Sequence, residues 1–451
     1  MHDLQKLYSV ANRRKMSTLA FLAQRNIPRS CLGNYRPICL MSNIGKLLEA
    51  VILNQLTCHL ESIFPNNMFG FRPGRSTQDA VVHTLDNIHQ LRESGYLVAV
   101  VAFNATSSFD CLDHSVILRS LEAIGVGSKM RTWISSFLKD CLIQVDIDGH
   151  LSSPWTVNIG VGQGRKLSPP LYNVGTLTQL LFNLLSQMSS YADDSCDVIH
   201  ARSSEDCNKR ILEVVSDRIQ WFKDVGLTMN IPKTELMGIG FTPSDVTIGD
   251  TVIHPKNEIK FLGTIIQANL KWESQVSFLR NKLRSAAARI RTEGRHFTVS
   301  DKRILFHGWV VGQLHCNGLA FLPALNMTEI DQLQRAMNAG IRAVVGLPRY
   351  GYAPISDITA KLGLPTLQKI KEKVLLQAAW KRFHEHKPKY SDGPMTRGRS
   401  MANIPHGNQK GHAGKISSTV LIPFWNRLPL TIKEQSDPRK AKRDIKKFLS
   451  N

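Results

Sequence analysis

The sequence is short of acidic residues and has no long apolar run. Asp and Glu number 36 against 57 Lys and Arg, which gives a formal net charge of +21 and a pI near 9.8. No apolar stretch is long enough to span a bilayer, and the first ten residues lack the apolar core of a secretory signal. We therefore expect an intracellular protein with no membrane association, without distinguishing nucleus from cytoplasm.

Cysteine is scattered. The eight cysteines form no CxxC pair, and no histidine follows them at zinc-finger spacing. This pattern predicts neither a zinc site nor a disulfide framework, and it fits a reducing compartment. Hydrophobic residues make up 42% of the chain and charged residues 21%, a globular rather than a disordered composition. A length of 451 residues indicates two or three domains.

The excess of basic residues indicates a polyanionic partner, because each phosphate that a protein neutralises releases counterions. Nucleic acid is the partner that we favour on this ground. The alternative is that the basic residues are spread over the surface for solubility, and composition alone does not separate a basic groove from dispersed charge.

Hydrophobic periodicity predicts alternating helices and strands up to residue 272. We expect a polar helix over residues 1–30, and a helix over 44–63 that leaves Glu49 outside its apolar stripe. Further helices are expected at 79–92, 115–138, 171–188 and 206–225. Strands are expected at 96–103, 236–241, 246–248 and 261–266, with a hairpin of 143–147 and 155–159 around residues 148–149.

Beyond residue 272 the pattern changes to basic helices. Residues 275–345 are expected to be mostly helical, and residues 388–416, rich in Pro, Gly and basic side chains, to form a flexible linker. A basic helix over residues 439–450 is expected to close the chain.

Two adjacent acids, Asp193 and Asp194, carry the most specific chemistry. Neighbouring carboxylates repel each other unless a cation lies between them, and hard divalent ions prefer such oxygen ligands. Two ions of this kind can stabilise both the attacking and the leaving oxygen of a phosphoryl transfer. Taken alone, the pair is better explained as an ordinary acidic turn, so its interpretation depends on the surrounding sequence.

That context is a series of motifs in a fixed order. The expected strand ending at Phe103 is followed by residues 104–110 (NATSSFD), then by the glycine-rich residues 160–164 (GVGQG), and then by residues 191–194 (YADD). This order resembles motifs A, B and C of the reverse transcriptases of non-LTR, LINE-like retrotransposons.

Other segments extend the resemblance from about Tyr35 almost to the end of the chain. They look like the two fingers motifs, motif D, motif E and a C-terminal segment of jockey-type elements: residues 35–38 (YRPI), 70–77 (GFRPGRST), 226–234, 261–263 (FLG) and 424–429 (FWNRLP). The endonuclease domain and the Cys/His knuckle of such elements have no counterpart in this sequence.

The resemblance implies an α+β fold of the right-hand polymerase type, with an antiparallel palm sheet and a helical, basic C-terminal extension. It implies an RNA-directed DNA polymerase that acts on an RNA template, a DNA primer or target, and deoxynucleoside triphosphates, with Mg²⁺ or Mn²⁺. The expected divisions are an N-terminal helical segment (1–34), fingers (35–97), palm (98–268), thumb (269–350) and a basic C-terminal region (351–451).

The resemblance also assigns roles near the expected cations. Asp193 and Asp194 are the implied metal ligands. Phe109 stands where family members exclude a ribose 2′-OH, although a core aromatic is the simpler explanation of that residue alone. Gln163 and Gly164 are implied to lie against the template or the incoming nucleotide, where a glycine lets the backbone approach closely.

Basic residues complete the implied site. Arg72 and Arg75 are placed to bind phosphates, with a solvated loop as the alternative. Lys233 is implied to act near the leaving pyrophosphate, although an exposed lysine explains it nearly as well. The thumb residues implied to contact the duplex backbone, or else to form a solvated helix face, are Lys282, Arg284, Arg289, Arg291 and Arg295.

The sequence departs from the family pattern at its most important position. Asn104 stands where motif A has Asp, so an amide without charge replaces a metal-binding carboxylate. Asp110 and Asp113 are nearby, but the expected helix after the strand should direct them elsewhere. We expect Asn104 to lie beside the turn that carries Asp193 and Asp194.

Motif B departs from the pattern as well. Gly162 stands where the family has Pro, Pro170 where Leu is expected, and Arg165 and Lys166 replace a Ser and a variable residue. These two cations are expected either to obstruct the nucleotide or to bind phosphate.

Two functions follow from the sequence. One is an RNA-directed DNA polymerase that uses Asp193, Asp194 and a weakened position 104. The other is a non-catalytic, nucleic-acid-binding remnant of such a polymerase. We favour little or no activity.

Overall fold

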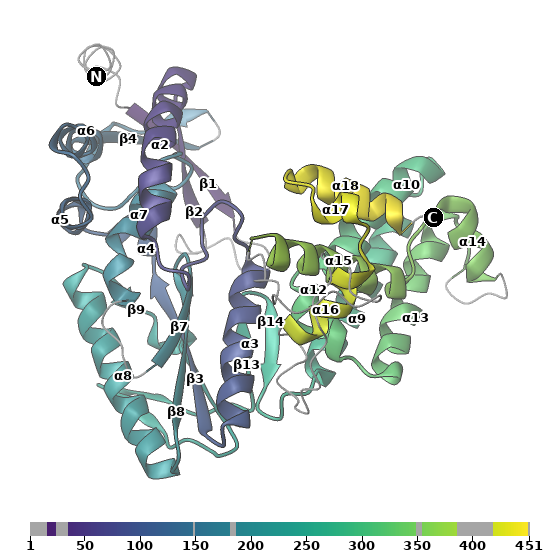
Figure 1. Cartoon of the computed structure of the whole chain (residues 1–451). Helices are drawn as coiled ribbons and strands as arrows, with labels where there is room; N and C mark the ends of the chain where they lie inside the picture. Colours follow the sequence, from purple (N-terminus) through teal and green to yellow (C-terminus); the bar gives the residue numbers. More distant parts are fainter. Residues whose placement is uncertain are drawn as a thin grey trace.

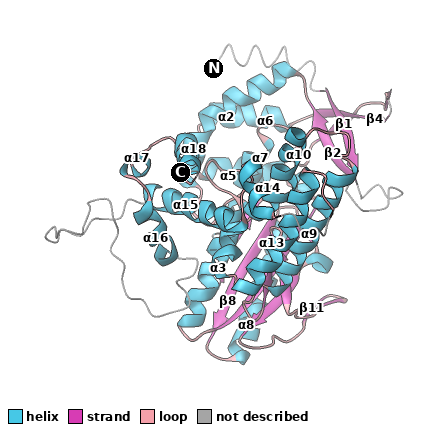
Figure 2. Ribbon diagram, turned by 90° about the vertical axis from the view of Figure 1, so that its right-hand side faces the viewer, coloured by secondary structure: helices cyan, strands magenta, loops and turns pink. Residues whose placement is uncertain are grey.

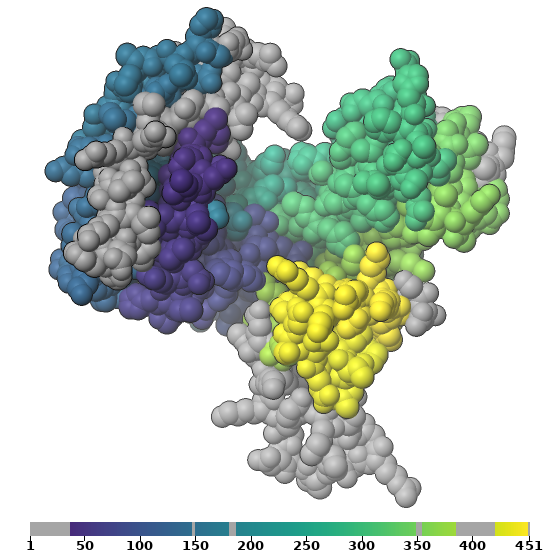
Figure 3. Space-filling view, turned by 90° about the horizontal axis from the view of Figure 1, so that it is seen from above, coloured from purple at the N-terminus to yellow at the C-terminus, as the bar shows by residue number. Residues whose placement is uncertain are grey.

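The computed structural model describes residues 16–23, 35–147, 149–180, 186–348, 354–385 and 418–449. A central sheet joins a first lobe, formed by the early part of the chain, to a second lobe built from helices (Figure 1). The molecule is hollowed between the two lobes when it is viewed from above (Figure 3). The C-terminal helices lie against the helical lobe.

The first lobe contains a small mixed sheet and one long helix. Its strands are β1 (Met16–Ala23), β2 (Tyr35–Leu40), β4 (Cys141–Ile147), β5 (His150–Leu151) and β6 (Trp155–Val157). The order is β2-β1-β4-β5, and β6 pairs with β4, which confirms the expected hairpin. The helix α2 (Asn43–Ile63) begins after Ser42, whose hydroxyl accepts a hydrogen bond from the Gly45 amide.

The helix expected over residues 1–30 is wrong where the structure describes this segment. Residues 16–23 form β1, and the other residues of that prediction lie outside the described residues. β1 pairs antiparallel with β2 and parallel with β4. Because β4 lies far along the chain, local periodicity does not reveal this pairing.

The central sheet is antiparallel, in the order β10-β3-β8-β7, with β9 against the end of β3. Its strands are β3 (Leu97–Thr106), β7 (Ser186–Tyr191), β8 (Asp194–Ala201), β9 (Thr228–Met229) and β10 (Glu235–Ile239). The sheet therefore brings together segments separated by long stretches of sequence.

Both faces of β3 are buried, which explains its uninterrupted apolar run. Val98 and Val100 belong to a core that includes residues of α3 (Thr77–Glu93) and of the helical lobe. Ala99 and Val101 belong to a second core that includes residues of α8 (Ser204–Asp224). A strand buried on both faces shows continuous rather than alternating hydrophobicity.

The long helix expected over residues 171–188 is wrong at its end. The structure has α7 (Ser168–Gly175), a short 3₁₀ helix η2 (Leu177–Leu180) and then strand β7. The Ser186 hydroxyl donates to Asp197 at 2.6 Å, and Arg218 of α8 forms a buried ion pair with Asp197 at 3.0 Å. These contacts with the neighbouring strand and helix favour β7, and an apolar sequence pattern does not contain them.

Turns divide two other predicted elements. Residues 115–138 form α5 (His114–Ala123) and α6 (Ser128–Leu138) rather than one helix. The strand expected at residues 261–266 is a hairpin of β13 (Glu258–Phe261) and β14 (Thr264–Gln267). Its two-residue turn is Leu262-Gly263, both with positive φ. β11 (Val246–Ile248) pairs with β12 (Thr251–Ile253).

The second lobe is helical, as expected for residues 275–345, and stands in front of the central sheet in Figure 2. Its elements are α9 (Glu273–Thr292), α10 (Val299–Phe306), the π-helix η4 (His307–Val311), α11 (Gly312–His315), α12 (Gly318–Phe321), η5 (Leu322–Ala324) and α13 (Met327–Val344). α9 and α13 pack closely, and their apolar residues share a core with α3.

The C-terminal helices extend this lobe. They are α14 (Ile355–Leu362), α15 (Leu367–Glu385), α16 (Ser418–Arg427), α17 (Leu430–Lys433) and α18 (Pro438–Phe448). The Trp380 indole donates to the Ile432 carbonyl at 2.9 Å, and Lys381 pairs with Asp79 of α3 at 2.8 Å. The basic helix expected at 439–450 is confirmed by α18, whereas the linker 388–416 lies outside the described residues.

The expected α+β fold of the right-hand type is confirmed. The first lobe, the central sheet and the helical lobe correspond to fingers, palm and thumb, and the residue boundaries between them stay predictions. No helix in the described ranges combines the length and the apolarity that a bilayer crossing needs.

Candidate functional site

The turn between β7 and β8 carries the two adjacent acids. β7 ends at Tyr191 and β8 begins at Asp194, so Ala192 and Asp193 form the turn itself. Ala192 has a φ of 57°, in the left-handed region that permits such a tight reversal. Both acids therefore lie where β7 and β8 meet at one end of the central sheet.

Asn104 lies directly beside this turn. In the antiparallel register of β3 and β8, Asn104 is paired with Asp194. The Asn104 Nδ2 donates to Asp194 Oδ1 at 2.9 Å. The expectation that the acid turn lies at the end of strand β3 is therefore confirmed.

The hydrogen bond determines how Asn104 is oriented. An ionised carboxylate only accepts hydrogen bonds, so the amide nitrogen must face Asp194. Held in this way, the Asn104 side chain donates a hydrogen bond to Asp194. An aspartate in its place would instead share a bound cation with Asp194. Among the described residues no group of three or more His, Cys, Asp or Glu side chains could hold a metal ion. The donor set beside Asp193 and Asp194 therefore fits a two-cation site poorly.

A loop of the fingers supports the acid turn from behind. Ser190 of β7 accepts from the Phe69 amide at 2.8 Å, and Asn173 of α7 donates to the Gly70 carbonyl at 2.8 Å. A Cβ atom added at Gly70 would lie 2.4 Å from the Ala192 backbone nitrogen. Only glycine fits this close approach without moving the turn.

Aromatic side chains adjoin the acids. Phe109 stacks on Tyr172 with ring centroids 4.3 Å apart, and Phe71 meets the Phe109 edge at 5.7 Å. Burial raises the pKa of Tyr172, and the charges of Asp193 and Asp194 raise it further, which places this phenol near both acids. Phe109 is half-buried, so it packs in the core and still reaches the surface beside the acid pair.

The motif B loop is held against β2. The Cys39 amide donates to the Gln163 carbonyl at 2.7 Å, and a Cβ at Gly164 would lie 3.1 Å from the Cys39 carbonyl oxygen. The Gln163 side chain donates to Asp110 at 3.1 Å, and burial raises the pKa of Asp110. A contact of Gln163 with template or nucleotide stays a prediction, and it would require this bond to open or to be shared.

Neither nearby aspartate takes the place of the missing motif A acid. Asp110 is engaged with Gln163. Asp113 caps α5, accepting from the Ser115 amide at 2.7 Å. Both carboxylates are thus held by other partners, in agreement with the expectation that they point elsewhere.

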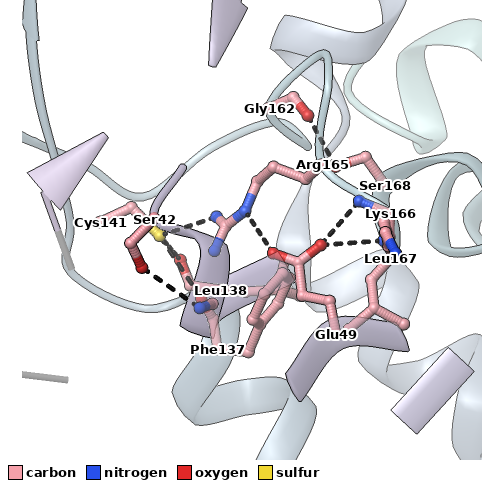
Figure 4. Close-up of polar contacts among 11 residues, drawn as sticks. Ser42, Glu49, Phe137, Leu138, Cys141, Gly162, Arg165, Lys166, Leu167 and Ser168 are labelled. Carbon is pink, nitrogen blue, oxygen red and sulfur yellow. Dashed lines mark hydrogen bonds and ion pairs between the residues drawn. The ribbon is translucent and has the colours of Figure 1, made fainter. Parts of the chain in front are cut away.

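Arg165 of the motif B loop is held by contacts within the first lobe. It forms an ion pair with Glu49 of α2 at 3.2 Å, and its guanidinium lies 4.0 Å from the centre of the Phe137 ring. The second Glu49 oxygen accepts from the backbone amides of Lys166 and Leu167 at 2.7 and 3.2 Å (Figure 4). The expectation that Arg165 obstructs the nucleotide or binds phosphate gains no support from these contacts, because the buried Glu49 holds its guanidinium within the first lobe.

Glu49 is buried, although the sequence pattern of the helix predicts that it is exposed. The sequence pattern places it outside the apolar stripe of α2, yet its exposure is 2%. Its burial is tolerated because the carboxylate is paired and accepts three hydrogen bonds in all.

The two fingers arginines differ. Arg72 is 8% exposed, pairs with Glu61 at 3.0 Å and donates to the Pro65 and Met68 carbonyls. Arg75 is half-buried and donates to Asn66 at 2.9 Å. These contacts give Arg72 a structural role, and its predicted phosphate contact gains no support from them. The phosphate contact expected for Arg75 stays a prediction.

Lys233 lies at the end of a segment bound to motif A. The Asn230 amide donates to the Asn104 carbonyl at 2.8 Å, and β9 pairs with the end of β3. Lys233 follows in the 3₁₀ helix η3 (Ile231–Lys233) with an exposed side chain. Its predicted role near a leaving pyrophosphate stays open.

The predicted thumb residues, which lie on α9 or, for Arg295, just after it, fall into two groups. Arg289 pairs with Glu293, and Arg291 donates to the Leu347 carbonyl at 3.1 Å. Lys282, Arg284 and Arg295 are exposed. Lys282, Arg284 and Arg295 are the better candidates for contacts with a duplex backbone, because Arg289 is already paired with Glu293 and Arg291 is bonded to a backbone carbonyl.

The comparisons with known proteins agree with this geometry. Residues 24–266 match the family described as reverse transcriptase (RNA-dependent DNA polymerase), and they make up more than half of the chain. The chain belongs to the reverse transcriptase family. Members of this family generally use divalent metal ions.

Curated relatives narrow the family to non-LTR retrotransposons. The chain is 24% identical over 375 residues to the RNA-directed DNA polymerase from mobile element jockey of Drosophila funebris, covering 78% of this chain and 39% of that protein. It is 22% identical over 359 residues to the probable RNA-directed DNA polymerase from transposon BS of Drosophila melanogaster, covering 74% and 39%. The chain thus spans about two fifths of the length of these relatives.

An apo telomerase from Candida tropicalis aligns with a TM-score of 0.44 at 13% identity, covering 84% of this reverse transcriptase and 66% of that chain.

Sequence reasoning missed three residues that support the site. Glu49 anchors the motif B loop, Asn173 holds Gly70, and Tyr172 stacks on Phe109. A polar residue inside the apolar run 167–175 (LSPPLYNVG) is the signal that could have indicated Asn173. No comparable signal distinguishes Glu49 from a solvated glutamate.

We expect Asn104→Asp to make folding stability depend on a divalent cation. The substitution sets a second carboxylate against Asp194, so the free energy of unfolding in EDTA should fall by about 1–3 kcal/mol and recover in Mg²⁺. Thermal unfolding with EDTA and with Mg²⁺ measures this. Asn104→Ala, which adds no charge, is the control and should show no recovery. A Mg²⁺ response of Asn104→Asp equal to that of the wild type would contradict the arrangement.

Gly70→Ala should displace the acid turn. The added methyl group meets the Ala192 backbone, and we expect unfolding free energy to fall by about 1–3 kcal/mol. Gly308→Ala is the control, because a Cβ there meets no atom within 4 Å. Denaturant unfolding of both variants checks the difference, and equal effects would show that the loop does not press on the turn.

Glu49→Ala should destabilise the protein by about 3–5 kcal/mol, because it leaves the largely buried Arg165 without its counter-charge. Glu49→Gln keeps an acceptor for the Lys166 and Leu167 amides and should cost less. Glu258→Ala, at an exposed strand position, is the control for removing a glutamate. Unfolding free energies rank the three variants, and a Glu49→Ala value close to that of Glu258→Ala would rule out the anchoring role.

Proposed function

We propose that this reverse transcriptase domain binds an RNA template with a DNA primer and carries out little or no nucleotidyl transfer. The order of its motifs, its membership in the family and its net charge of +21 support nucleic-acid binding. The proposal places the protein inside the cell, as the domain of a non-LTR retrotransposon protein.

The observation that carries the proposal is the hydrogen bond from Asn104 to Asp194. An aspartate at this position would give the acid turn a third negative charge with which to hold cations. The amide supplies none, and it occupies one Asp194 oxygen as well. Loss of one preorganised electrostatic group at a reacting centre costs at least on the order of 100-fold in rate.

The remaining groups support substrate binding. Phe109, which the buried Tyr172 ring supports from below, is the apolar surface on which the sugar of a deoxynucleotide would pack. Lys282 and Arg284 of α9 and Arg295, just after this helix, are exposed, and we place the template–primer backbone along this segment. Arg75 and Lys233 remain the candidates for contacts with nucleotide phosphates. Mg²⁺ or Mn²⁺ is the cofactor that we assign to any residual activity.

Primer extension on an RNA template in Mg²⁺ or Mn²⁺ tests the proposal. We expect the wild type to extend at least about 100-fold more slowly than Asn104→Asp, with template–primer affinity unchanged between the two. Asn104→Asp/Asp194→Asn, which has the same number of acids as the wild type, is the matched control and should stay inactive.

Two results would count against this proposal. Wild-type extension as fast as that of Asn104→Asp would show that position 104 does not limit catalysis. Failure of Asn104→Asp to gain activity, with template–primer still bound, would move the cause of inactivity away from Asn104.

A further inference from the structure

The last helix of the described chain presents a basic face to solvent. Ala441 and Ile445 of α18 are fully buried, so the helix is fixed by its apolar side. Arg439, Lys442 and Lys446 follow at helical spacing and share one side of the cylinder, and all three are exposed. This face is continuous along the helix.

Other cations adjoin this face. α18 packs on α15, which carries the half-exposed Lys373. Burial lowers the pKa of His307, in the π-helix after α10, and the nearby charges of Lys446, Arg303 and Lys373 lower it further. These groups therefore lie within electrostatic range of one another. We call the set Arg303, His307, Lys373, Lys442 and Lys446 the C-terminal basic surface.

Three acidic side chains on or next to these elements are held by other partners. Asp301 forms the capping box of α10 with Thr298. Glu372 of α15 pairs with Arg427, and Asp437 caps the start of α18. Asp444 lies two residues before Lys446 and thus on the opposite side of the helix.

Like charges gathered in this way favour an anion. Burial, followed by the charge of Lys446, lowers the pKa of Lys373, so the cluster pays an electrostatic cost that a bound anion would relieve. Burial and the charges of Lys373 and His307 likewise lower the pKa of His315, to about 4. A bound phosphate would oppose each of these shifts.

The chemistry of α18 distinguishes between two anionic partners. A helix that binds a membrane surface inserts its apolar face between lipids. Ala441 and Ile445 are instead buried in the helical lobe. A nucleic-acid backbone needs only the exposed cations and no apolar face.

We propose that the C-terminal basic surface is a second nucleic-acid-binding site, which contacts the backbone phosphates of a duplex outside the active site. α18 lies on the helical lobe, to the right of β7 and β8 in Figure 1, whereas the end of α15 reaches α3 through the Lys381–Asp79 ion pair. The site rests on the proposed function only in requiring that the protein binds nucleic acid, and it is independent of nucleotidyl transfer.

Equilibrium binding by the whole protein tests this site, with fluorescent RNA and DNA duplexes of arbitrary sequence and no nucleotides. Lys442→Gln/Lys446→Gln removes two exposed charges. We expect its affinity for either duplex to fall about five- to tenfold, and the slope of log K against log salt to decrease by about 1–2. An effect on only one of the two duplexes would show whether RNA or DNA occupies the site.

Lys209→Gln/Lys223→Gln is the matched control, because both lysines are exposed on α8. Equal losses in the two double variants would overturn the proposal, since binding would then follow net charge alone. Tighter binding of the wild type to vesicles of anionic phospholipid than to either duplex would also overturn it.

The outcomes separate this site from the proposed function. A wild type that binds no duplex contradicts both. A wild type that binds normally, together with an unaffected Lys442→Gln/Lys446→Gln variant, contradicts the second site alone.

Discussion

The register between β3 and β8 is the constraint on which the site depends. It places Asn104 opposite Asp194, and β3 then carries the motif D segment on its other edge through β9. A slip of one residue would turn the Asn104 side chain to the opposite face of the sheet. Because both faces of β3 are packed, such a slip would also exchange the residues of two cores, which fixes the register strongly.

Within this register, Asn104 changes the requirements of the acid turn. Two facing carboxylates need a cation or a proton between them, whereas an amide and a carboxylate satisfy each other. A substitution that weakens the chemistry can therefore leave the fold intact. Arg165 is accommodated in a similar way, because the buried Glu49 neutralises its charge. Both departures from the family pattern are thus accommodated by partners within the protein.

The sequence predicted those parts of the structure that short motifs and strong periodicity determine. Asn104 and the acid turn come together as expected, and α2, α3, α8 and α18 lie close to their predicted ranges. The failures share a cause. β1 and β7 owe their conformation to strands elsewhere in the chain, and Glu49 is buried by a partner more than a hundred residues away. Periodicity within one segment contains no information about such partners.

Binding and catalysis make opposite demands on charge in this protein. The binding of a duplex backbone that we propose uses the basic side chains of α9 and α18, whereas nucleotidyl transfer would use the carboxylates of one turn. Replacing an acid by Asn104 removes a negative charge from the place where phosphates must approach. The change therefore reduces the capacity for cation-assisted chemistry while it lessens the repulsion of the nucleic acid. For this reason the proposed loss of nucleotidyl transfer is compatible with an unchanged hold on a template.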